Sequence, residues 1–167
     1  MENLELRVEI CKNVKERRCL FTDHFRGFEK VDVVKRIFGD AAAETLAKLA
    51  VEFTKATLYM RVDNFDGHLM INPEYFLNAD ISDIYLDIVH ELVHVKQFLE
   101  GKISDQDLNY VERPLEIEAY KITVDEARAI GISENRIFDY LDSDLLSSEE
   151  LKQLAGTIGV DTADYPQ

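Results

Sequence analysis

The segment that most constrains the fold is IYLDIVHELVHVKQFLEG, residues 84–101. Its apolar residues recur at helical spacing, which predicts a helix that runs to about Glu100 and stops before Gly101. Two of the chain's four histidines, His90 and His94, lie four residues apart in this segment. On a helix that spacing puts both imidazoles on one face, one turn apart.

Two imidazoles on one helical face can bind a single metal ion. The alternative is a core helix that happens to carry two histidines. A single histidine on an apolar helix face is usually a core residue, but two histidines four residues apart with a glutamate between them form a less ordinary pattern. Glu91 follows His90 and is rotated by about 100° around the helix, so it lies beside such an ion rather than on it. There it can take a proton from zinc-activated water and pass it to a leaving amine.

A catalytic zinc ion needs a third protein ligand. The segment YVERPLEIEAYKI (110–122) offers Glu116 and Glu118 on a second helix that Pro114 can begin. Residues two apart point to different faces of a helix, so only one of these carboxylates can reach the ion. Ala119 lies three residues after Glu116, and a small residue there allows close approach of two helices. The spacing favours Glu116, with Glu118 as the alternative.

The rest of the chain predicts an α+β protein with a small antiparallel sheet. Residues 57–76 alternate in polarity around DNFDG, which predicts strand, turn and strand, with Pro73 ending the second strand. Asp80 or Ser82 can cap the histidine helix, Ser133 caps a later one, and Ser147 with Glu150 forms a capping box. The remaining expected elements are a strand at 4–10 and helices at 29–39, 40–56 (capped by Asp40), 114–130, 134–142 and 148–158.

Charge and composition limit the possible partners. The net charge is −14, and residues 56–167 carry 8 basic against 23 acidic side chains. An acidic protein is repelled by phosphate backbones, so we expect no nucleic-acid partner. No apolar run is long enough for a membrane span, and the N-terminus lacks a signal-peptide pattern, which predicts a cytoplasmic protein. Cys11 and Cys19 would then remain thiols.

The pair of motifs resembles a known class of enzymes. HELVH followed 22 residues later by EIEAY is similar to the gluzincin metallopeptidases, in which a glutamate on a separate helix completes the zinc site. The Glu-x-Glu-Ala form resembles the CaaX-protease and HtpX-like families and the ImmA/IrrE-type proteins. The compact arrangement is most similar to the soluble minigluzincins. This resemblance implies a zincin-like fold and zinc bound by His90, His94 and Glu116. One departure is Tyr120, where those families often have aspartate.

The resemblance covers about residues 57–131 and implies how the chain is divided. It implies a single domain over 1–167, with a metallopeptidase core at 56–131, an N-terminal extension at 1–55 and C-terminal helices at 132–167. The extension could be a pro-segment, a partner-binding element or additional sheet. The stretch HLMINP (68–73) corresponds to the edge strand that lies above zinc in such folds and can pair with an extended substrate.

The implied function is a zinc metalloendopeptidase acting on peptide or protein substrates, with Glu91 as general base and then general acid. A hydrogen-bond donor for the oxyanion is also expected. Tyr110 is favoured because its loop precedes the glutamate helix; Tyr120, His68 and Tyr140 are the alternatives. Two other functions stay open. One is a regulatory protein of this fold that binds a dedicated partner with narrow or no proteolytic activity, and the other is a helical interaction module without metal.

Overall fold

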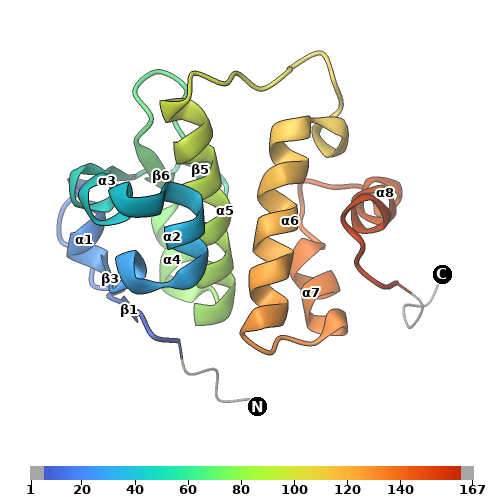
Figure 1. The fold of residues 1–167 in the computed structure, drawn as a ribbon, viewed down its shortest axis with the longest axis horizontal. Coiled ribbons are helices and arrows are strands. Elements are labelled where there is room, and N and C mark those ends of the chain that lie inside the picture. Colours follow the sequence, from blue (N-terminus) through green and yellow to red (C-terminus); the bar gives the residue numbers. More distant parts are fainter. Residues whose placement is uncertain (1–5, 163–167) are drawn as a thin grey trace. The chain divides into compact units, whose positions relative to one another are not determined.

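The computed structural model describes residues 6–162, which fall into two compact units that divide after Lys102. The chain is α+β, as expected, and Figure 1 shows its order of elements. No helix among the described residues is both long and apolar enough to cross a membrane. In the first unit the elements are β1 (Glu9–Ile10), β2 (Arg18–Leu20), α1 (Phe21–His24), β3 (Phe25–Arg26), α2 (Asp32–Phe38), α3 (Ala42–Lys48), β4 (Ala50–Phe53), β5 (Met60–Val62), β6 (Leu69–Ile71), α4 (Pro73–Asn78) and α5 (Ile81–Leu99), with 3-10 turns at Phe28–Lys30 and Gly39–Ala41.

The sheet of the first unit is mixed, which corrects the prediction of an antiparallel sheet. Its strand order is β2-β4-β6-β5, with β4 and β6 parallel and the other two pairs antiparallel. β1 and β3 form a separate antiparallel pair. Of the strand predicted over 4–10, only Glu9–Ile10 is a strand among the described residues, and residues 4–5 lie outside them. β6 is an inner strand, so the expectation that residues 68–73 form an edge strand is wrong. The edges are β2 and β5.

The predicted helix over 40–56 is also wrong in its second half. Only α3 is helical there, Ala41 rather than Asp40 is its N-cap, and residues 50–53 form β4. The three residues Val51, Glu52 and Phe53 are buried because β4 lies between β2 and β6. Helical periodicity in an Ala-rich segment does not reveal this pairing, which depends on residues far along the chain. Through β2 and β4 the N-terminal third contributes half of this sheet.

The core of the first unit forms around α5. Asp80 caps this helix through its side chain, which accepts the Ser82 N–H, and Gly101 lies just after the helix with φ of 72°. Residues on every side of α5 are buried, which is typical of a helix enclosed by other elements; it packs against α2 and β5. A cluster of fully buried phenylalanines on the N-terminal elements and α4 completes this core: Phe21, Phe25, Phe28 and Phe76.

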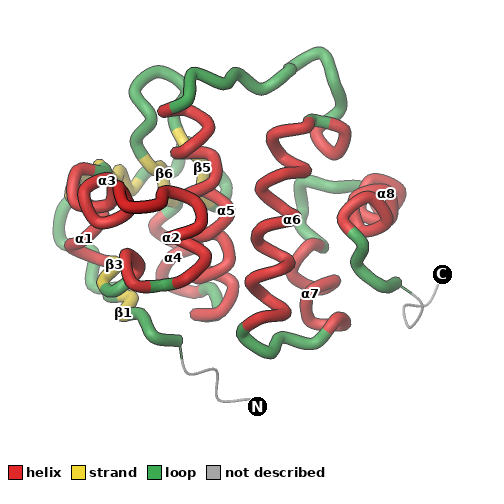
Figure 2. The backbone as a smooth tube through the Cα atoms, viewed as in Figure 1, coloured by secondary structure: helices red, strands yellow, loops and turns green. Residues whose placement is uncertain are grey.

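The regular elements described in the second unit are all helices (Figure 2). Ser133 caps α7 and Ser147 with Glu150 forms the capping box of α8, as predicted. Pro114 is the first residue of α6, also as predicted. The elements are a 3-10 turn at Tyr110–Glu112, α6 (Pro114–Ala129), α7 (Glu134–Leu141) and α8 (Ser148–Ile158).

Candidate metal centre

The two histidines of the HELVH motif lie together on α5. The Nε2 atoms of His90 and His94 are 3.1 Å apart, and the ring centroids are 4.8 Å apart with the planes at 76°. His90 is buried and His94 is partly buried. Both rings therefore direct the same nitrogen toward one point, as the helical spacing predicted. Two nitrogen donors so placed can bind one metal ion.

Gln97 orients one of these rings. Its side chain is 3% exposed, and its Oε1 atom is 2.7 Å from Nδ1 of His94, one turn back on α5. An amide oxygen only accepts hydrogen bonds, so Nδ1 of His94 carries the proton and Nε2 keeps its lone pair. A hydrogen bond to the far nitrogen is the usual support of a metal-binding histidine. The sequence reasoning missed Gln97, although its place three residues after His94 was a usable signal.

Glu91 is 7% exposed and follows His90 on α5. The helix rotates its carboxylate by about 100° from the first imidazole. A buried carboxylate on the helix that carries both imidazoles can act as a general base.

A polar contact between α4 and α5 lies one turn before Glu91. The Tyr75 hydroxyl donates to the Asp87 carboxylate, and the ring of Tyr59 packs edge-on against Tyr75 at 5.1 Å. Burial and the negative charge of Asp87 raise the pKa of Tyr75 well above its ordinary value. Tyr75 therefore stays protonated and fixes the N-terminal half of α5.

The predicted third ligand belongs to the second unit. Glu116 lies in the first turn of α6 and Glu118 lies two residues later; both side chains are partly exposed. Ala119 is fully buried. Its carbonyl accepts a hydrogen bond from the Thr123 hydroxyl at 2.8 Å.

Tyr110, the predicted oxyanion donor, lies close to Tyr120. The hydroxyls of Tyr110 and Tyr120 are 3.1 Å apart, and their rings pack edge to face with centroids 6.3 Å apart. The guanidinium of Arg113 lies 5.8 Å from the Tyr110 ring. Tyr140, another alternative, lies on α7.

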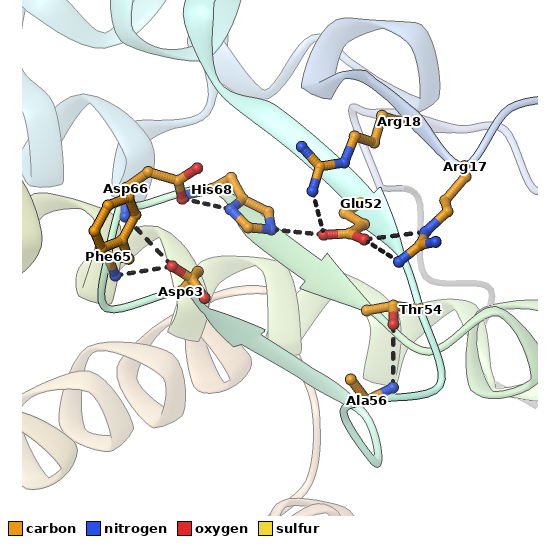
Figure 3. Close-up of polar contacts among 9 residues, drawn as sticks. All are labelled: Arg17, Arg18, Glu52, Thr54, Ala56, Asp63, Phe65, Asp66 and His68. Carbon is orange, nitrogen blue, oxygen red and sulfur yellow. Dashed lines mark hydrogen bonds and ion pairs between the residues drawn. The ribbon is translucent and has the colours of Figure 1, made fainter.

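His68, the last alternative, is held in a polar network of the first unit (Figure 3). Its Nε2 atom is 3.0 Å from Glu52, and its Nδ1 atom contacts the Asp66 carboxylate. Both ring nitrogens are thus engaged, which does not suit an oxyanion donor. Comparisons of the chain with family models, curated proteins and solved structures gave no match.

Proposed function

We propose that the chain is a zinc-dependent metallopeptidase. The observation that carries the proposal is the convergence of the Nε2 atoms of His90 and His94, 3.1 Å apart. The contact of Gln97 with His94 supports it, because that contact leaves a lone pair on the converging nitrogen. The buried Glu91 on the same helix adds the acid–base group that peptide hydrolysis requires.

The third zinc ligand in this proposal is Glu116, with Glu118 as the alternative. Two carboxylates two residues apart on α6 differ by about 200° in direction, so they cannot both face one ion. Ala119, three residues after Glu116, lies on nearly the same side of α6 and is fully buried. The side of α6 that carries Glu116 is therefore the side suited to close packing.

Each side chain then has a defined task. When bound, zinc supplies the Lewis acidity that polarises a scissile carbonyl and lowers the pKa of a bound water to near neutral pH. Glu91 accepts the proton of the attacking water and delivers it to the leaving amine nitrogen. Tyr110 donates a hydrogen bond to the developing oxyanion; it can do so when Tyr120, whose hydroxyl is 3.1 Å away, donates to it.

The substrate class follows from the sheet. β5 is an edge strand and packs against α5, the helix that carries both histidines. An extended peptide can add to such an edge through main-chain hydrogen bonds. We therefore expect peptides or protein segments in extended conformation as substrates, with selectivity that depends weakly on side chains.

The test combines zinc analysis with hydrolysis of a quenched peptide library. Wild type should bind an equivalent of zinc that His90→Ala removes, and its hydrolysis should stop with chelator. Glu91→Gln should keep that zinc and lose at least about 100-fold in kcat, the usual contribution of a general base. Glu100→Gln, which removes the same charge at the exposed end of α5, should behave as wild type.

Other results would reject parts of the proposal. Zinc that depends on His90 without turnover in any condition would favour a regulatory protein of this fold. If no zinc depends on His90 and chelator does not change the unfolding of the protein, the remaining hypothesis is a helical interaction module without metal. If Glu118→Gln loses zinc and Glu116→Gln keeps it, the third ligand is Glu118 rather than Glu116.

A further inference from the structure

A second group of metal-binding side chains lies in the turn between β5 and β6. Asp63, Asp66 and His68 each offer a ligand atom, and these atoms lie within 4.8 Å of one another. All three come from the six-residue segment DNFDGH, entirely within the first unit. They belong to none of the residues proposed above for catalysis, so this group is independent of that function.

The turn itself holds the two carboxylates in place. The Asp63 Oδ1 atom accepts the N–H groups of Phe65 and Asp66 at 2.8 and 3.3 Å. The Asp66 Oδ1 atom accepts the N–H of His68 at 3.1 Å. These bonds use one oxygen of each carboxylate, which leaves the Oδ2 atom of each for a cation. The Asp63 N–H in turn donates to the His68 carbonyl, which closes the turn.

The orientation of the imidazole is set from outside the turn, by Glu52 on β4 (Figure 3). Glu52 is opposite Met70 in the parallel β4–β6 pair, and His68, two residues before Met70, lies on the same side. The Glu52 Oε2 atom is 3.0 Å from His68 Nε2. Glu52 is 5% exposed, so this contact is shielded from water.

Two arginines keep Glu52 ionised. Arg17 donates to its Oε1 atom through Nε and Nη2 at 3.0 and 2.6 Å, and Arg18, its cross-strand neighbour on β2, donates to Oε2 at 3.3 Å. Burial alone would raise the pKa of Glu52, but these hydrogen bonds and that from His68 outweigh it, and the pKa is lowered. A carboxylate can only accept, so Nε2 of His68 carries the proton.

The other ring nitrogen then faces a carboxylate. The Nδ1 atom of His68 contacts the Oδ1 atom of Asp66, and Asp63 offers a further ligand atom close to both. An ion pair between His68 and Asp66 engages these two side chains only, whereas a divalent cation can bind all three, because their ligand atoms lie within 4.8 Å of one another.

We infer that Asp63, Asp66 and His68 bind a divalent transition-metal ion such as Mn²⁺ or Zn²⁺, with Glu52 holding the imidazole from behind. A buried carboxylate that accepts the remote N–H of a histidine ligand is the usual support of such a site. One imidazole and two carboxylates suit these borderline ions, and the ligand charges balance the ion. The ion stabilises the β5–β6 turn, and water occupies the remaining coordination positions of the ion.

The surroundings allow an ion to reach this group. Asp66 is exposed, and together with His68 it lines an open pocket of about 320 Å³ that also contacts Val95 and Phe98 of α5. The pocket places the proposed ion at the surface of the first unit, where water can complete its coordination sphere. This arrangement suits a site that loads after folding.

The test is Mn²⁺ binding to the full chain after chelator treatment, followed by electron paramagnetic resonance. His90→Ala with His94→Ala removes the proposed catalytic site, and this variant should still bind one Mn²⁺. Adding Asp63→Asn and Asp66→Asn should weaken that binding at least 100-fold, and adding Glu52→Gln should weaken it 10- to 100-fold. The matched pair Asp32→Asn and Asp40→Asn, which removes two exposed charges from the same unit, should change nothing.

Spectroscopy identifies the nitrogen ligand. Nitrogen-14 modulations from a bound imidazole should appear in the Mn²⁺ echo signal of the His90→Ala, His94→Ala variant and disappear on adding His68→Gln. Circular dichroism checks that each variant is folded. Loss of all Mn²⁺ binding when His90 and His94 are replaced, or binding that survives Asp63→Asn with Asp66→Asn, would overturn the inference and leave His68 as an ion-pair partner only. Neither result depends on whether the chain cleaves peptides.

Discussion

Replacement of Gln97 tests whether its hydrogen bond orients the His94 imidazole for zinc binding. Gln97→Leu keeps the volume of this buried side chain nearly constant and removes the oxygen that lies 2.7 Å from His94 Nδ1. Loss of such a hydrogen bond behind a metal ligand typically weakens metal affinity 10- to 100-fold. Since each tenfold change is about 1.4 kcal/mol, the expected loss is about 1.4 to 2.8 kcal/mol of zinc-binding free energy.

The assay is competition for zinc against a fluorescent chelator of known affinity. Gln97→Glu should bind zinc at least as tightly as wild type, because a carboxylate accepts the same N–H and makes the imidazole more basic. Gln153→Leu, the same replacement at an exposed position of α8, serves as the control. A Gln97→Leu affinity within twofold of wild type, with the unfolding midpoint preserved, would refute the orienting role of Gln97.

Two further predictions concern the stability of the first unit. Gly67→Ala should lower the free energy of unfolding by about 2 to 4 kcal/mol in urea titrations, because Gly67 has φ of 78° and an added Cβ would lie 2.4 Å from the Phe98 ring. Gly101→Ala, with φ of 72° and nothing within 4 Å, should lose only about 1 kcal/mol; equal losses would mean that the ring moves aside freely. Glu52→Gln, measured in chelator, should lose about 1 to 3 kcal/mol at pH 7 because the charged hydrogen bonds from Arg17 weaken. The pKa of Glu52 is lowered in the folded state, so this stabilisation is present above its unfolded value near 4.5 and should fade as the pH falls below it; a difference between wild type and variant that persists at pH 3 would contradict this.

Local chemistry explains what could be predicted from the sequence. Helix caps depend on atoms three or four residues apart, and Asp80, Ser133 and Ser147 cap their helices as expected. The convergence of His90 and His94 is equally local, since one helical turn fixes it. Glu116 comes from a different helix and a different unit, and its role as a zinc ligand stays a prediction.

The errors have a common origin in contacts between residues distant in sequence. Residues 50–53 follow a helix and continue its apolar pattern, yet they form a strand because β2 and β6 provide partners on both sides. That strand carries Glu52, whose carboxylate contacts the imidazole of His68 sixteen residues later. The two histidines of the predicted site thus lie within one helix, whereas the contact between Glu52 and His68 requires a parallel strand pair. A helix over 40–56 would place Glu52 in a helix and leave His68 as an isolated turn residue, because only the pairing of β4 with β6 brings these two side chains together.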